Sequence, residues 1–136
     1  MSTLTLHLFH HTEPYALASV APGTTIDWDR DGCAIFSIAY TSTEISVICP
    51  QRCIPTGTRQ EGPFHAFEVA GPLDFAQTGV LAGLFGPIAA KSIPLLSTST
   101  YETDFILVPV DHADQAEQVW RREGFLVTPP ILGDGS

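Results

Sequence analysis

The sequence predicts an α+β fold, and two observations lead to this prediction. Between residues 64 and 127, segments with a two-residue apolar period alternate with segments of helical period, in the order strand, helix, strand, strand, helix, strand. When the chain is compared with itself at an offset of 60 residues, strand segments of the first half fall on those of the second half. We therefore expect two related βαββαβ repeats.

The second half opens with a strand and a helix. Residues 64–69 are typical of a strand, and a Gly-Pro pair ends it. A helix is expected over residues 77–90, opened by a capping box of Asp74 and Gln77. The predicted apolar face of this helix consists of Leu81, Leu84, Phe85 and Ile88.

A hairpin, a second helix and a last strand follow. Residues 93–98 and 105–110 are expected to pair across a wide polar tip at 99–104. Asp111 is expected to cap the second helix, and residues 125–127 form the last strand. The second helix should bury Ala113, Ala116, Val119 and Trp120. This half is therefore predicted to be a ferredoxin-like unit.

The first half repeats the strands but not the helices. Proline and glycine in residues 20–25 and 49–62 resist long helices. The same offset of 60 residues places Glu44 on Asp104. The first half is therefore expected to be a degenerate, helix-poor repeat that relies on the second half for its core. Its strands are expected at residues 4–9, 35–38 and 45–48.

The composition excludes several classes of partner. The chain has 136 residues with 15 acidic and 6 basic side chains, which gives a net charge of -9. No nucleic-acid partner is expected, because that binding depends on clustered Lys and Arg. No membrane partner is expected, because no apolar run approaches the roughly 20 residues of a spanning helix. Residues 1–11 lack the features of a secretory signal and the three cysteines suit a reducing compartment, so we expect a cytoplasmic protein.

No motif indicates a catalytic, metal or cofactor site. His7, His10 and His11 have no spacing that pairs them with the cysteines as metal ligands. Three residues lie between Cys49 and Cys53 instead of two, so the two cysteines do not resemble a zinc knuckle, and no role is expected for them. We therefore expect no enzyme activity, no metal and no cofactor, with a small hydrolase or transferase as an alternative.

Three segments resemble a known family. They are Gly71-Pro-Leu-Asp-Phe-Ala-Gln-Thr-Gly-Val-Leu81, residues 97–107 and residues 42–50. These segments resemble the tandem ACT domain family, which includes the CASTOR arginine sensors and related bacterial hypothetical proteins. The resemblance implies βαββαβ domains that bind a small molecule, usually an amino acid, at an interface between ACT units. It also implies regulation in place of catalysis.

The resemblance also implies a ligand-binding site. Backbone N–H groups at the start of the first helix would receive a ligand carboxylate, and Asp104 would accept a hydrogen bond from its ammonium group. Where the arginine sensors carry an acidic residue, this chain has the neutral Gln77, which argues against arginine as the ligand. The residues implied for the site are Gln77, Gly79, Val80, Thr100, Tyr101 and Asp104.

The same residues have ordinary structural roles as alternatives. Gln77 could only complete the capping box, Gly79 could serve helix packing, and Asp104 could be a solvated hairpin residue. A dimerisation or interaction module without a ligand is a further alternative. We expect a homo-oligomer, because Gly79, Gly83 and Gly86 offer a surface for close approach. The predicted division is a degenerate ACT-like half at 1–62, an ACT domain at 63–128 and a flexible tail at 129–136.

Overall fold

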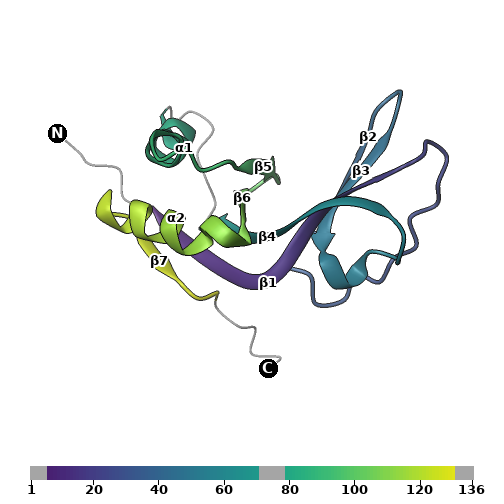
Figure 1. Ribbon diagram of the computed structural model, residues 1–136, viewed down its shortest axis with the longest axis horizontal. Coiled ribbons are helices and arrows are strands. Elements are labelled where there is room, and N and C mark those ends of the chain that lie inside the picture. Colours follow the sequence, from purple (N-terminus) through teal and green to yellow (C-terminus); the bar gives the residue numbers. More distant parts are fainter. Residues whose placement is uncertain (1–5, 71–78, 131–136) are drawn as a thin grey trace. The chain divides into compact units, whose positions relative to one another are not determined.

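The computed structural model describes residues 6–70 and 79–130 of the chain. These residues form an α+β fold of the predicted ferredoxin type, with two α-helices and seven strands (Figure 1). The chain divides into two compact units. Unit 1 combines Met1–Thr12 with His65–Ser136, and unit 2 is Glu13–Phe64. In sequence, unit 2 is therefore inserted between the two segments of unit 1.

Unit 1 contains five strands in the order β7-β1-β4-β6-β5. Strand β7 pairs in parallel with β1, with His7 opposite Leu126, and β5 pairs antiparallel with β6. Residues 7–12 of β1 thus add one strand to the four predicted for residues 64–127. The bounds are β1 (His7–Val20), β4 (Arg59–Val69), β5 (Leu96–Ser99), β6 (Asp104–Pro109) and β7 (Leu126–Thr128).

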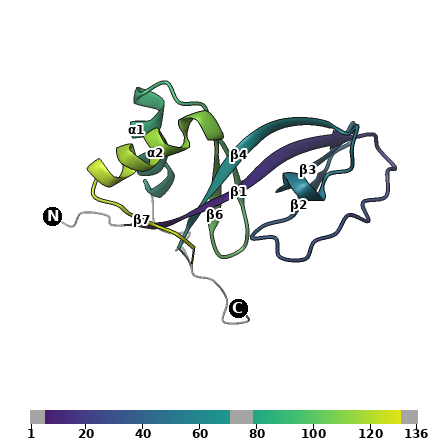
Figure 2. The same ribbon diagram turned by 60° about the horizontal axis from the view of Figure 1, so that its bottom comes forward.

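Two helices supply the other layer of unit 1. Helices α1 (Val80–Ala90) and α2 (Val110–Arg122) lie side by side (Figure 2). Trp120 of α2 is fully buried. Its indole N–H donates to the carbonyl oxygen of Leu84 in α1 over 2.8 Å, and its ring meets Phe67 of β4 edge-on. Neither described helix is long and apolar enough to cross a membrane. The shared core includes Leu8, Phe67, Val69, Leu84, Ile88, Ile106, Val108, Ala116, Trp120 and Val127.

The helix faces and starts differ in part from the predictions. The four residues predicted for the buried face of α2 are buried, which confirms that face. In α1 the prediction of Leu81 is wrong: this side chain is 42% exposed, and Val80 takes its place in the core beside Leu84 and Ile88. Asp111 lies in the first turn of α2, not at its N-cap, because Pro109 occupies that position. The predicted capping box of residues 74–77 lies outside the described residues.

Unit 2 is poor in helix, as predicted, but it has its own small core. The prediction that the first half relies on the second half for its core is therefore wrong for residues 13–62. Strand β3 (Ile45–Pro50) pairs with β1 on one side and with β2 (Ser37–Tyr40) on the other. The only helix within residues 13–64 is the 3-10 turn η1 (Gln51–Cys53). Gly62 of β4 has a φ of 145°, and a Cβ there would lie 3.0 Å from the carbonyl oxygen of Tyr15, so glycine is required. The core of unit 2 consists of Ala16, Ala18, Ile26, Ile45, Val47, Cys49 and Ile54.

The two units contain matching hairpins. Adding 59 to the bounds of β2 and β3 gives the bounds of β5 and β6, and the strand registers match as well. The offset of 60 read from the sequence is therefore wrong by one residue for these hairpins. Glu44 corresponds to Thr103, and Asp104 corresponds to Ile45. The assignment of residues 1–62 and 63–128 as a degenerate and a complete ACT repeat stays a prediction.

Candidate functional site

Three of the predicted ligand-binding residues lie in the β5–β6 hairpin. Thr100 and Tyr101 are exposed at its tip, and the half-buried Asp104 begins β6. The backbone N–H of Thr100 donates to the carbonyl oxygen of Thr103 over 2.8 Å, which closes the turn. The Asp104 carboxylate accepts a hydrogen bond from the Ser99 hydroxyl. A carboxylate offers about four acceptor positions, so one hydroxyl donor leaves Asp104 with capacity for an ammonium group.

Two further predicted residues lie at the start of α1. Gly79 is the N-cap residue with a φ of 84°, a left-handed conformation that favours glycine. A Cβ at this position would meet no described atom within 4 Å. Val80 is only 7% exposed and packs in the core, so it could offer a ligand its backbone N–H but not its side chain. Gln77 lies outside the described residues.

The hairpin tip lies at the end of the sheet where the chain leaves for α1. The hydroxyl of Thr103 donates a hydrogen bond to the carbonyl oxygen of Val69, the last residue of β4. From Val69 the chain continues through residues 71–78 to Gly79. The hairpin tip therefore lies at the end of β4, and Gly79 is the first described residue that follows residue 70. The spacing between Gly79 and Asp104 that a ligand would need stays a prediction.

Unit 1 also contains a pair of histidines, His10 and His65, for which the sequence predicted no role. His10 is 8% exposed, and its Nδ1 lies 2.7 Å from a carboxylate oxygen of Glu117 while its Nε2 lies 2.8 Å from Nδ1 of His65. Arg121 pairs with the other Glu117 oxygen at 3.2 Å. Burial, and after it the nearby His10, lower the pKa of His65. These residues come from β1, β4 and α2, so no local spacing could have revealed the pair.

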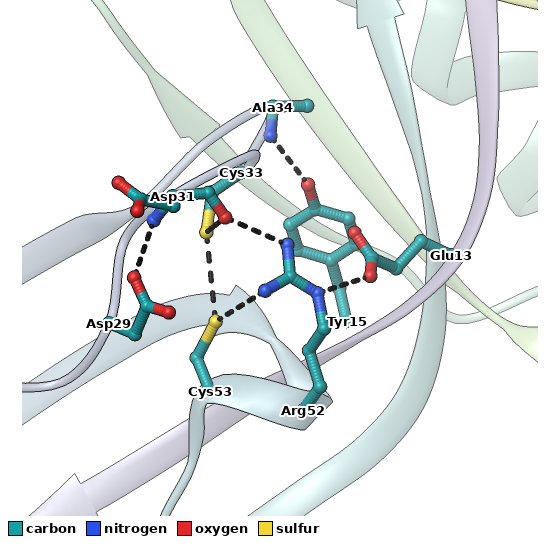
Figure 3. A network of polar contacts seen from close by, with 8 residues as sticks. All are labelled: Glu13, Tyr15, Asp29, Asp31, Cys33, Ala34, Arg52 and Cys53. Atoms are coloured by element: carbon teal, nitrogen blue, oxygen red, sulfur yellow. Dashed lines mark hydrogen bonds and ion pairs between the residues drawn. The ribbon is translucent and has the colours of Figure 1, made fainter.

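Unit 2 contains a polar network centred on Arg52 of η1 (Figure 3). The guanidinium donates from Nε to Glu13 over 2.6 Å, from Nη2 to the Asp31 carbonyl oxygen over 3.1 Å and from Nη1 to Cys53 Sγ over 3.6 Å. The hydrogen bond with Glu13 raises the pKa of Arg52, so the side chain stays charged. Cys33 Sγ lies 3.6 Å from Cys53 Sγ. One guanidinium thus ties together β1, η1 and the β1–β2 connection at residues 21–36.

Tyr15 provides a second tie to the same connection. Its ring is 1% exposed, and its hydroxyl accepts the backbone N–H of Ala34 over 3.0 Å. Burial raises the pKa of Tyr15 to about 12, so its hydroxyl stays protonated at neutral pH. The ties at Asp31 and Ala34 lie on either side of Cys33 and hold it toward η1 (Figure 3).

Two hollows open on the surface of unit 2. One of about 300 Å³ is lined by Glu13, Pro14, Gln51 and Arg52. The other, of about 380 Å³, contains side chains of both charges, as binding of a zwitterion would require. The larger hollow is lined by Leu17, Ala18, Ser19, Glu44, Ser46, Arg59, Gln60 and Glu61.

Within the described parts of the chain, no three His, Cys, Asp or Glu side chains are grouped as they would be around a metal ion.

Comparison with protein families gives a match in the second half. Residues 61–121 match a family described as ACT domain. The match includes the β5–β6 hairpin and the start of α1, and therefore all six of the predicted ligand-binding residues. A search of curated proteins gives no match.

Solved structures share the fold over most of the chain. An Agobacterium tumefaciens protein is 22% identical with a TM-score of 0.85, and the alignment covers 96% of this chain and 97% of that one. A Vibrio cholerae protein of unknown function, described as a possible transport protein, is 16% identical with a TM-score of 0.72 and coverage of 88% and 90%. The regulatory subunit of aspartate kinase from Thermus flavus is 9% identical with a TM-score of 0.59 and coverage of 86% and 96%. Because all three identities are low, the likeness shows a shared fold and nothing more.

Proposed function

We propose that the protein is a regulatory, non-catalytic module that binds an amino acid at its ACT domain. The observation that carries the proposal is the ACT domain match at residues 61–121, which includes a hairpin carboxylate and a glycine-capped helix start. The regulatory subunit of an aspartate kinase has a similar fold, which supports a regulatory role. The three free cysteines agree with a cytoplasmic location.

The ligand is proposed to lie between the start of α1 and the β5–β6 hairpin. Its carboxylate would accept backbone N–H groups at Gly79 and Val80, where the helix dipole is positive. Its ammonium would donate to Asp104, whose carboxylate is oriented by the Ser99 hydroxyl. Thr100 and Tyr101 at the tip, together with Gln77, would line the side of the site.

A homo-oligomer is part of the same proposal. A Cβ at Gly83 would lie 4.0 Å from Phe125, and at Gly79 and Gly86 it would meet no described atom within 4 Å. Close approach within the described part of the chain therefore does not account for these glycines. A second copy packed along this side of α1 would use them. Light scattering should give a mass above 14.7 kDa at micromolar concentration, and a particle of 14.7 kDa would contradict this part of the proposal.

The ligand is sought by a thermal-shift screen of the twenty amino acids, and its affinity is measured by calorimetry. A ligand at a hundredfold excess over its Kd stabilises the folded state by roughly 2.7 kcal/mol. Asp104→Ala should weaken binding roughly ten- to hundredfold, because it removes a charge-assisted hydrogen bond. A protein that none of the twenty stabilises would instead be an interaction module without a ligand.

Glu44→Ala is the matched control. Glu44 is a hairpin carboxylate that, like Asp104, accepts a serine hydroxyl, here from Ser46 over 3.0 Å. It also lines the hollow of about 380 Å³ in unit 2. Unchanged affinity in Glu44→Ala supports the site at Asp104. Unchanged affinity in Asp104→Ala, or a larger loss in Glu44→Ala, would place the ligand in unit 2.

A further inference from the structure

Two of the three cysteines are held in contact by a network that neither the proposed ligand site nor the core explains. Cys33 belongs to the connection at residues 21–36 and Cys53 ends η1, yet their sulfur atoms lie 3.6 Å apart. Both side chains are half-buried, so a small oxidant can reach them. Cys49 is fully buried in the core of unit 2.

The guanidinium of Arg52 donates a hydrogen bond to Cys53 Sγ, one of the two sulfur atoms. Its Nη1 lies 3.6 Å from Cys53 Sγ, while its Nη2 holds the carbonyl oxygen of Asp31, two residues before Cys33. Glu13 fixes the third nitrogen, Nε, at 2.6 Å. The guanidinium therefore donates to Cys53 and keeps Cys33 within reach of it. A positive charge beside the sulfur atom is typical of reactive cysteines.

We propose that Cys33 and Cys53 are a peroxide-reactive thiol pair that forms an intramolecular disulfide, with Cys53 as the attacking thiol and Arg52 as the residue that positions both. Figure 3 shows the two sulfur atoms facing each other beside the guanidinium. The oxidant is hydrogen peroxide, and the product is a covalent link between the 21–36 connection and η1.

The reaction proceeds in two steps. The Cys53 thiolate attacks one peroxide oxygen, the O–O bond breaks, and the departing hydroxide takes up a proton to leave as water, so Cys53 becomes a sulfenic acid. Cys33 then attacks the sulfenic sulfur, the S–S bond forms, and the hydroxyl group leaves as a second water with the Cys33 proton. One peroxide is reduced to two waters, and two thiols are oxidised to one disulfide.

The different surroundings of the three sulfur atoms support this order of events. Burial, followed by the hydrogen bond to Cys53, raises the pKa of Cys33 to about 11, so Cys33 remains a thiol that can donate its proton. Burial raises the pKa of Cys49 to about 12, which makes it unreactive at neutral pH. The pair therefore has one candidate attacking thiol and one resolving thiol.

The test exposes the reduced full-length protein to hydrogen peroxide, blocks remaining thiols with N-ethylmaleimide and maps the peptides by mass spectrometry. We expect one chain to lose the mass of two hydrogen atoms and to yield a Cys33–Cys53 cross-linked peptide. Cys49 should stay a thiol. Cys33→Ser should instead accumulate a sulfenic acid at Cys53 that dimedone captures. Peroxide that leaves Cys33 and Cys53 as thiols, or that links Cys49 or two chains, would overturn the proposal.

The positioning role of Arg52 has its own readout. Arg52→Gln should oxidise roughly tenfold more slowly at pH 7, and its oxidation rate should rise only at higher pH, because the thiolate has lost the adjacent charge. Arg52→Lys should restore part of the rate. A merely structural role would change the rate without moving its pH dependence, and that result would remove Arg52 from the proposal.

Discussion

The two hairpins of this protein have the same strand lengths and register but different surroundings. The β5–β6 hairpin follows α1 and precedes α2, and its unit has a core that includes both helices. The β2–β3 hairpin follows the irregular connection at residues 21–36 and precedes η1, which has three residues. One hairpin is thus stabilised through helix packing, and the other lacks a helix to pack against.

What replaces the helices in unit 2 is a set of polar ties. Tyr15 holds Ala34, and Arg52 holds Asp31 and Glu13. Each tie satisfies a backbone or charged group that a long irregular connection would otherwise leave without a partner. Loss of one tie should therefore affect unit 2 differently from loss of an apolar side chain in unit 1.

The largest expected effect is the loss of stability when a tryptophan is removed, and it should differ between the two tryptophans. Trp120→Ala should lower the free energy of unfolding by about 3 to 5 kcal/mol, because it removes a fully buried ring and its hydrogen bond to Leu84. Trp28→Ala should cost less, because Trp28 is half-buried at the edge of the unit 2 core. Urea unfolding of both variants gives the comparison. Equal losses would show that the two cores contribute alike.

A middle-sized effect tests the polar ties. Tyr15→Phe should lower the free energy of unfolding by about 1 to 2 kcal/mol, because the Ala34 N–H loses its buried acceptor. Tyr40→Phe is the control, and since Tyr40 is 69% exposed its effect should stay within about 0.5 kcal/mol. If the two variants have the same stability, the tie to Ala34 contributes nothing.

The raised pKa of Tyr15 also predicts that the protein loses stability at high pH. Burial raises its pKa from 10.0 to about 12, so the unfolded chain releases the phenol proton first as the pH rises. The contribution is fully present below pH 10.0 and is lost as the pH rises toward about 12. Denaturation series at increasing pH should therefore show a steeper decline for the wild type than for Tyr15→Phe, and parallel curves would contradict this.

The smallest effect concerns the histidine pair of unit 1. Burial and His10 lower the pKa of His65 below 6.5, so its contribution to stability is present above pH 6.5 and is lost as the pH falls below it. His65→Gln should make the unfolding free energy less dependent on pH between about 7 and 5. An equal pH dependence in the wild type and in the variant would contradict this.

Much of the fold follows from local patterns in the sequence. The buried face of α2 was predictable because Ala113, Ala116, Val119 and Trp120 repeat at helical spacing. The misplacement of Leu81 arose because α1 is apolar on nearly all sides, so its period does not specify one face. The hairpin offset was wrong by one residue because β3 and β6 are short, mostly apolar runs with few distinguishing side chains. A shift of one residue exchanges the two faces of a strand, so Asp104 lost its predicted counterpart.

The candidate site was predictable only in part, and for a physical reason. The hairpin tip was identified from its residues, and Thr103 brings it to the end of β4. The Arg52 network joins residues from three distant segments, and such contacts leave no local period or spacing. Cys33 and Cys53 had no recognisable motif, because the tertiary fold brings them together.

Strand β1 determines the order in which this chain can fold during synthesis. Unit 2 has its complete sequence once residue 64 has been made, whereas residues 7–12 must wait for the rest of unit 1. Their parallel pairing joins His7 to Leu126, which closes a loop of nearly the whole described chain. Such a contact forms slowly because the entropy of a long loop must be lost first. Until α1, α2 and β7 have been made, Leu8, which is fully buried in the finished protein, lacks part of the core that covers it, so β1 exposes apolar surface during synthesis.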